Sequence, residues 1–95
     1  MKRAFVYILA SKRNGTLYIG VTSDLTRRIW QHKERMTEGF TKTYDIGLLV
    51  WFEECTSIED AILREKRLKK WERSWKLKLI EHDNPEWIDL YDSIL

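Results

Sequence analysis

The fold is decided by residues 16–28, TLYIGVTSDLTRR, which join an apolar strand to the start of a helix. Within the strand, Gly20 carries no side chain and leaves room for another group to approach closely. Asp24 is a suitable N-cap, because its carboxylate can accept hydrogen bonds from the free N–H groups of a first helical turn. We therefore predict a helix over residues 24–35.

A second apolar run, residues 4–10, lies upstream, and the turn-forming sequence SKRNG separates the two runs. This pattern predicts a β-hairpin. A two-residue loop at 14–15 pairs residues whose numbers sum to 29, whereas a four-residue loop at 11–14 gives a sum of 25. Both sums are odd, so Tyr7 and Tyr18 share one face in either register. The two tyrosines are either a packing pair beneath a helix or part of a site.

Length and composition limit the class of protein. Ninety-five residues predict a single domain, 1–95, with one modest core. The single cysteine, Cys55, excludes an internal disulfide and is typical of a reducing cytosol, so we expect a cytoplasmic protein. The apolar run at 4–10 is too short and lacks the cleavage site of a signal peptide, and no stretch is long enough to span a membrane. We therefore expect no membrane partner.

The rest of the chain predicts one more strand and two more helices. The apolar run LLVWF predicts a strand over residues 46–55 that is central or covered by helices. A helix that Ser57 caps follows, to about residue 71. We also predict a helix over residues 74–82, which the sequence Asn84-Pro85 ends. The remaining segments are predicted to be a loop at 37–45 and a short amphipathic tail at 86–95.

Two helix faces carry unusual polar residues. In the first helix, Leu25, Ile29 and Met36 form the predicted apolar stripe, and Arg28 and His32 lie one turn apart beside it. In the second helix, the predicted stripe consists of Ile58, Ala61, Ile62, Leu68 and Trp71. Glu65 stands on this stripe, and a buried carboxylate needs a partner. It is either half of an ion pair with a neighbouring cation or Arg28, or a ligand for a hard divalent cation.

A basic segment begins in the same helix. Residues 64–78 contain eight Lys or Arg residues, interleaved with Trp71 and Trp75, in a chain whose net charge is only +2. Such a run is either a solvated helix face or a nucleic-acid surface, since cations contact phosphates and indoles stack on bases. A mixed aromatic and basic stretch at 40–44 allows the same two interpretations. The predicted nucleic-acid-binding residues are Lys42, Arg64, Arg67, Lys69, Lys70, Arg73 and Lys76.

Four pieces of the chain, taken in order, resemble the GIY-YIG endonuclease superfamily and its small single-domain bacterial members. The pieces are Tyr7-Ile8-Leu9, Tyr18-Ile19-Gly20, the run from Asp24-Leu25 through Arg28 to His32, and Glu65 within REKRLKKW. The resemblance implies an α/β fold of the α+β type, a three-stranded antiparallel sheet flanked by three to four helices. It also favours the four-residue hairpin loop. The first motif departs from the family by lacking the glycine of its name.

The resemblance also implies metal-dependent hydrolysis of phosphodiester bonds. Tyr18, with Tyr7, would orient or deprotonate the attacking water, and His32 would assist at the phosphate or in proton transfer. Arg28 would neutralise the scissile phosphate, a role that suits a guanidinium fork. Glu65 would hold one Mg²⁺ or Mn²⁺ ion, which stabilises the leaving oxygen.

Two hypotheses of function result. The first is a divalent-metal-dependent endonuclease, structure-selective or weakly specific, that acts on duplex, branched or single-stranded DNA in DNA repair or recombination; RNA is not excluded as a substrate. The second is a nucleic-acid-binding module with the same fold and little cleavage, serving a protein partner. A purely structural interaction domain is the third reading. Glu65 distinguishes them, because binding alone does not require a carboxylate on an apolar stripe.

Overall fold

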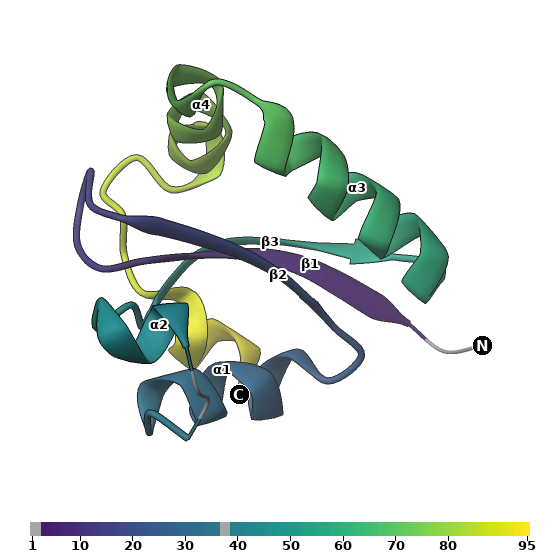
Figure 1. Cartoon of the computed structure of the whole chain (residues 1–95), viewed down its shortest axis with the longest axis horizontal. Helices are drawn as coiled ribbons and strands as arrows, with labels where there is room; N and C mark the ends of the chain where they lie inside the picture. Colours follow the sequence, from purple (N-terminus) through teal and green to yellow (C-terminus); the bar gives the residue numbers. More distant parts are fainter. Residues whose placement is uncertain (1–2, 37–38) are drawn as a thin grey trace.

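The computed structural model describes residues 3–36 and 39–95. Its elements, in chain order, are β1 (Ala4–Ala10), β2 (Leu17–Thr22), α1 (Leu25–Lys33), α2 (Phe40–Thr43), β3 (Leu48–Cys55), α3 (Ile58–Lys70), α4 (Arg73–Asp83) and the 3₁₀ helix η1 (Leu90–Ile94). The strands form one antiparallel sheet in the order β2-β1-β3. Figure 1 shows α3 and α4 on one face of this sheet and α1, α2 and the C-terminal η1 on the other. The predicted α+β fold, with a three-stranded antiparallel sheet flanked by helices, is confirmed.

The hairpin register differs from both predicted registers. Tyr7 pairs with Gly20 and Leu9 with Tyr18, so paired residue numbers sum to 27 rather than 25 or 29. The physical reason lies in Ser11, which extends the ladder: its N–H donates to the Thr16 carbonyl at 3.0 Å, and its hydroxyl accepts from the Thr16 N–H at 3.0 Å. The loop therefore has four residues, shifted by one along the chain. The sum is still odd, and the prediction that the two tyrosines share a face is confirmed.

Strand β3 is an edge strand that helices cover, rather than a central one. An irregularity in its pairing shifts the register between Ile8, which pairs with Trp51, and Leu9, which pairs with Leu49. As a consequence Val50 and Trp51 both join the core beneath α3 and α4. Leu49 joins the second core, beneath α1 and η1.

The predicted stripe of the first helix is wrong at one position. Leu25 and Ile29 are buried as expected, but Met36 is 61% exposed and lies beyond the end of α1. His32 takes the inward position instead and is 4% exposed. Because 25, 29 and 32 are spaced as one helix face, the imidazole is directed into the protein rather than along its side.

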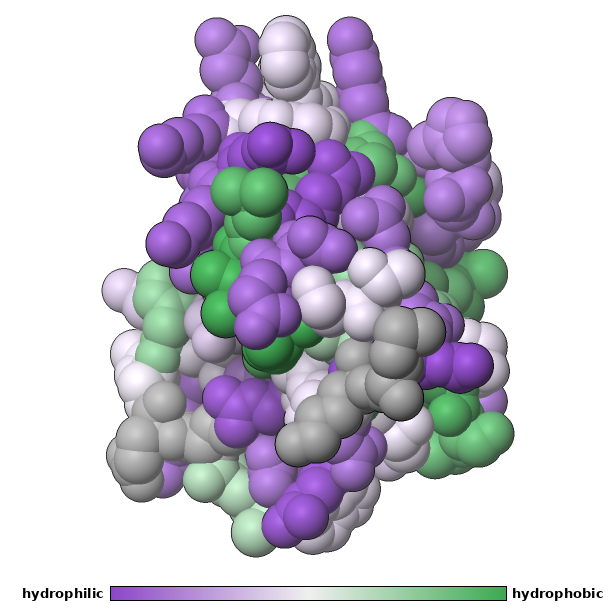
Figure 2. All heavy atoms as spheres, turned by 90° about the vertical axis from the view of Figure 1, so that its right-hand side faces the viewer, coloured by the Kyte–Doolittle hydropathy of each residue, from purple (hydrophilic) through white to green (hydrophobic). Residues whose placement is uncertain are grey.

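The helix α3 begins where Ser57 was predicted to cap it: the Ser57 hydroxyl accepts from the Asp60 N–H at 3.1 Å. The predicted inward stripe was too wide, since Ile58 and Ile62 are exposed at its border. The helix lies over the sheet mainly through Ala61 and Leu68, which are both fully buried. Figure 2 looks onto the side of the molecule where β3 ends and α3 begins, and shows hydrophobic atoms exposed among hydrophilic ones.

The segment predicted as a loop at 37–45 contains the short helix α2. Residues 37 and 38 lie outside the described part of the chain. Helix α2 has only one turn and no side-chain cap, so no periodic pattern predicted it; Gly39 precedes it with φ of 102°. Within residues 3–36 and 39–95, no helix has the length and apolar character needed to cross a membrane.

Candidate active site

The two tyrosines of the hairpin meet above Gly20. Tyr7 stands on the central strand β1 and is 1% exposed, while the half-buried Tyr18 stands on the edge strand β2. Their ring centroids are 6.3 Å apart. A Cβ atom at Gly20 would lie 2.5 Å from the Tyr7 hydroxyl oxygen and 3.0 Å from Tyr18 Cε2. The absent side chain at Gly20 therefore makes room for the Tyr7 side chain to extend across β2.

His32 joins the tyrosines from helix α1. Its Nε2 lies 3.0 Å from the Tyr7 hydroxyl, and its Nδ1 lies 3.0 Å from the hydroxyl of Thr41 in α2. The imidazole centroid is 5.8 Å from the Tyr7 ring and 5.5 Å from the Tyr18 ring. Thr41 is itself buried, so this contact also holds the one-turn helix α2 against α1.

The protonation states of this chain of contacts follow from burial. Burial raises the pKa of Tyr7 to about 12, and the nearby Arg28 guanidinium only partly opposes this shift. Burial, together with the positive charge of Arg28, lowers the pKa of His32 to about 4. At neutral pH both groups are therefore uncharged, and one hydrogen bond joins the Tyr7 hydroxyl to His32 Nε2. The neutral imidazole carries its proton on one ring nitrogen, so it donates one of its two hydrogen bonds, to Tyr7 or to Thr41, and accepts the other.

A pH dependence of stability follows from His32. In the unfolded chain a histidine binds its proton near pH 6.5, whereas folded His32 does so only near pH 4. Between these values the unfolded state binds more protons, so we expect the free energy of unfolding to fall as the pH is lowered from about 6.5 to 4. The slope from this one group is at most about 1.4 kcal/mol per pH unit.

Urea unfolding at several pH values, with the NMR titration of the imidazole signals, measures this effect. His82, the other histidine, lies on the surface and gives an internal reference signal. A His32 signal that titrates near pH 6.5 in the folded protein would contradict the burial that we describe.

Two opposite charges, those of Arg28 and Glu65, act on the pKa of Tyr7. Arg28 of α1 is half-buried, and its Nη1 donates to the Gln31 side chain at 3.3 Å. Glu65 comes from α3, on the other face of the sheet, and its side chain is 19% exposed. Its carboxylate contributes to the raised pKa of Tyr7, which places it in the same electrostatic environment. The two faces of the sheet therefore meet at the edge strand β2, where α3 packs.

The ion-pair reading of Glu65 has a partial basis. Lys69 Nζ lies 3.3 Å from the Glu65 carboxylate, one turn along α3. However, the Lys69 side chain is 54% exposed, so this pair is not a buried one. An exposed pair of this kind contributes about 0–1 kcal/mol. The contact does not explain why a carboxylate occupies the inward edge of the helix.

Glu65 is the one side chain that we consider as a ligand for a magnesium ion. Across the described parts of the chain, no group of three or more His, Cys, Asp or Glu residues could hold a metal ion. Mg²⁺ is commonly bound through one or two carboxylates, with water and substrate phosphates completing its shell. Glu65, as a single partly exposed carboxylate, fits that arrangement.

The aromatic cluster extends beyond the predicted residues. The ring of Phe40 in α2 stacks on Tyr18, with centroids 6.4 Å apart and planes at 26°, and the Tyr44 ring follows at 4.7 Å. Both additional rings are exposed. Their stretch was noted in the sequence for its composition, whereas nothing in the sequence pointed to the contact between Thr41 and His32.

The residues predicted to bind nucleic acid lie in different surroundings. Lys42, Arg67 and Lys70 are exposed, on α2 and α3. Arg64 is half-buried: its Nε lies 3.2 Å from a Glu53 carboxylate oxygen, and its guanidinium lies over Trp51 and Trp71. These contacts give Arg64 a structural role in holding α3 on β3. Arg73 and Lys76, on α4, contact backbone carbonyl oxygens.

Comparison with known proteins agrees with this geometry. The model of the GIY-YIG catalytic domain matches residues 3–78, which include the tyrosine strands, α1 and α3. This chain belongs to the GIY-YIG family. It is 37% identical over 81 residues to a UPF0213 protein of Staphylococcus haemolyticus, covering 85% of this chain and 98% of that protein. It is 34% identical over 87 residues to a UPF0213 protein of Syntrophus aciditrophicus, covering 90% and 98%.

A solved structure resembles this GIY-YIG chain over most of its length. The solution NMR structure of a UPF0213 protein from Bacillus halodurans matches with a TM-score of 0.55 and 27% identity, covering 92% of each chain. The resemblance recognised from four short motifs is thereby confirmed, as is membership of a nuclease family.

Proposed function

We propose that this GIY-YIG chain is a divalent-metal-dependent endonuclease that hydrolyses phosphodiester bonds in DNA. The observation that carries the proposal is the convergence of Tyr7, Tyr18 and His32 at the edge of the sheet, with the charges of Arg28 and Glu65 acting on the same hydroxyl. Packing alone explains an aromatic cluster. It does not explain why a cation from one face and a carboxylate from the other approach it.

The five residues divide into two groups by exposure. Tyr7 and His32 are almost fully buried and bonded to each other, so they act as positioning residues that hold the wall of the site. Tyr18, Arg28 and Glu65 are all partly exposed and can touch a substrate. In the proposed reaction, Tyr18 orients the attacking water and Arg28 binds the non-bridging phosphate oxygens as a fork.

Glu65 would hold one Mg²⁺ or Mn²⁺ ion, which when bound supplies stabilisation of negative charge on the leaving oxygen. The remaining work belongs to the protein. The neutral His32 is hydrogen-bonded to the Tyr7 hydroxyl and adds no charge of its own. Arg28 is therefore the one cation of α1 that we assign to the phosphate. A neutral His32 exerts no charge repulsion on it.

A nicking assay tests the proposal directly. Supercoiled, branched and single-stranded DNA, with an RNA of matching sequence, are incubated with the full chain with and without Mg²⁺ or Mn²⁺. We expect metal-dependent cleavage that Arg28→Ala removes. Preference for branched DNA would fit a role in repair or recombination. Binding without cleavage under every condition would instead support a nucleic-acid-binding module that serves a partner protein.

Nucleic-acid binding should depend on the basic segment. We expect the combined change Lys69→Gln, Lys70→Gln and Lys76→Gln to weaken binding to all sequences. With fewer phosphate contacts, binding releases fewer counterions from the nucleic acid. The slope of log affinity against log salt should become shallower by about 2–3 in total. Titrations in EDTA at several salt concentrations measure it. Arg35→Gln removes an exposed cation that pairs with Asp45, and provides the control. An unchanged slope in the triple variant refutes this mapping.

A further inference from the structure

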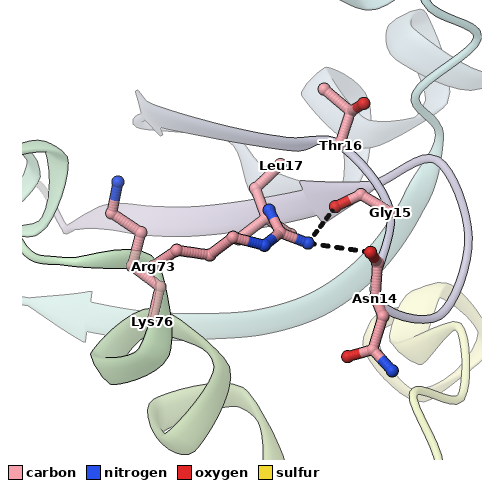
Figure 3. A pocket seen from close by; sticks show the side chains of 6 residues that line it. All are labelled: Asn14, Gly15, Thr16, Leu17, Arg73 and Lys76. Carbon is pink, nitrogen blue, oxygen red and sulfur yellow. Dashed lines mark hydrogen bonds between the residues drawn. The ribbon is translucent and has the colours of Figure 1, made fainter.

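A cavity of about 580 Å³ lies between the hairpin turn and helix α4, and we call it the turn pocket. Its lining residues are Asn14, Gly15, Thr16, Leu17, Arg73 and Lys76. Figure 3 shows Arg73 reaching from α4 across to the turn, whereas the Lys76 side chain leaves the same helix in another direction. The described residues that line the pocket thus include two cations and no acid.

The Arg73 guanidinium is held in place without being neutralised. Its Nη2 donates to the carbonyl oxygens of Asn14 at 2.8 Å and Gly15 at 2.6 Å. Lys76 Nζ donates to the Lys69 carbonyl oxygen at 3.4 Å, which is a long hydrogen bond. Carbonyl groups carry no net charge, and within residues 3–36 and 39–95 neither cation forms an ion pair with a carboxylate. Both positive charges are therefore available to an anion.

The turn pocket adjoins the strand that carries Tyr18. Thr16 and Leu17 line the pocket and lead directly into Tyr18 on the edge strand β2, about 7 Å further along the strand from Thr16. A second path runs through the helices, because Lys76 contacts Lys69 and Lys69 pairs with Glu65. A strand of nucleic acid that follows the edge of β2 would therefore pass both places.

We propose that the turn pocket is a phosphate-binding subsite, which receives a backbone phosphate flanking the scissile one. A guanidinium pre-positioned by two carbonyls and a flexible ammonium are the groups that bind a phosphate dianion or diester. That the ligand is a nucleic acid rests on the proposed function. The affinity of the pocket for phosphate rests on its two cations alone. The pocket would set where the strand lies along β2, and hence which phosphate reaches Tyr18 and Arg28.

Inorganic phosphate is the first probe. It is titrated into the ¹⁵N-labelled full chain at low ionic strength while the backbone amide signals of the turn, Gly15, Thr16 and Leu17, are followed. We expect saturable shifts in the wild type, their loss in Lys76→Ala and their return in Lys76→Arg. Arg35→Gln is the control, because Arg35 is an exposed cation outside the basic segment that pairs with Asp45. Arg73 is left unchanged, since it also holds the turn.

A short oligonucleotide in EDTA is the second probe, and it distinguishes a strand from free phosphate. In Lys76→Ala the slope of log affinity against log salt should become shallower by about 0.7–0.9, with no change in Arg35→Gln. No saturable shift with phosphate, or equal shifts in Lys76→Ala, overturns the subsite. Phosphate binding with an unchanged oligonucleotide slope overturns its role on the substrate path. If the wild type cleaves no nucleic acid, the proposed function fails, while the phosphate titration still decides the pocket.

Discussion

Glu65→Gln is expected to abolish metal-dependent cleavage while leaving the protein folded and able to bind nucleic acid. The carboxylate is the one that we assign to the metal ion, and loss of an ion that stabilises transition-state charge lowers the rate by at least about 100-fold. Its one ion-pair partner among the described residues, Lys69, is more than half exposed and can be solvated when the pair is lost. The free energy of unfolding should therefore change by less than about 1 kcal/mol.

Thermal melts, nicking rates and affinities in EDTA on one purified variant measure the three quantities. Glu59→Gln is the matched control, because Glu59 is an exposed carboxylate on the same helix. It should leave cleavage unchanged. The alternative, a structural Glu65, makes the opposite forecast: breaking a fully buried pair destabilises a protein by roughly 3–5 kcal/mol. A large destabilisation with residual cleavage would support that reading and count against the nuclease assignment.

The shared face of the tyrosines could be predicted because it depends only on parity. Any hairpin register in which the numbers of paired residues have an odd sum places Tyr7 and Tyr18 on one face. The prediction is therefore correct although the predicted loop is wrong. The loop itself could not be predicted, since Ser11 uses its own side chain to extend the ladder before the chain turns. Turn chemistry of that kind is a choice between nearly equal local arrangements.

Glu65 could be recognised because a charge breaks an apolar stripe, a signal that helical periodicity makes visible. The predicted stripe is nevertheless too wide, since α3 contacts the sheet mainly through Ala61 and Leu68 and leaves Ile58 and Ile62 exposed. The contact between His32 and Thr41 lay beyond prediction. It joins two helices through a connection without a periodic pattern, and only tertiary packing brings the two side chains together.

The inward position of His32 alters the chemistry that its sequence position suggested. Beside the apolar stripe and near the boundary of the sheet, as predicted, the imidazole could assist at the phosphate or in proton transfer. In the structure it is buried, neutral and bonded on both ring nitrogens. It therefore connects α2 to Tyr7 through hydrogen bonds. The exposed rings of Phe40 and Tyr44, which belong to the α2 segment, are thereby held beside the two tyrosines of the site.

Gly20→Ala should disturb both the stability and the activity of the protein. The new methyl group would lie 2.5 Å from the Tyr7 hydroxyl oxygen and 2.6 Å from its Cζ. The rigid, buried Tyr7 ring cannot move away without losing its hydrogen bond to His32. Overpacking of this kind destabilises by about 1–3 kcal/mol. Because Tyr18 Cε2 is only 3.0 Å away, we also expect cleavage to fall by up to about 100-fold through misplacement of that ring.

Gly47→Ala provides the matched control, since the nearest atom to its new methyl group, Lys33 Cγ, is 3.9 Å away. It should change the free energy of unfolding by no more than about 0.5 kcal/mol. A double-mutant cycle locates the strain: Tyr7→Phe removes the atom closest to the added methyl group and should recover part of the stability lost in Gly20→Ala. Denaturant unfolding of the four cycle members measures this coupling. Additive effects would show that the Tyr7 hydroxyl does not lie over Gly20. They would contradict the position that we assign to Tyr7 in the active site.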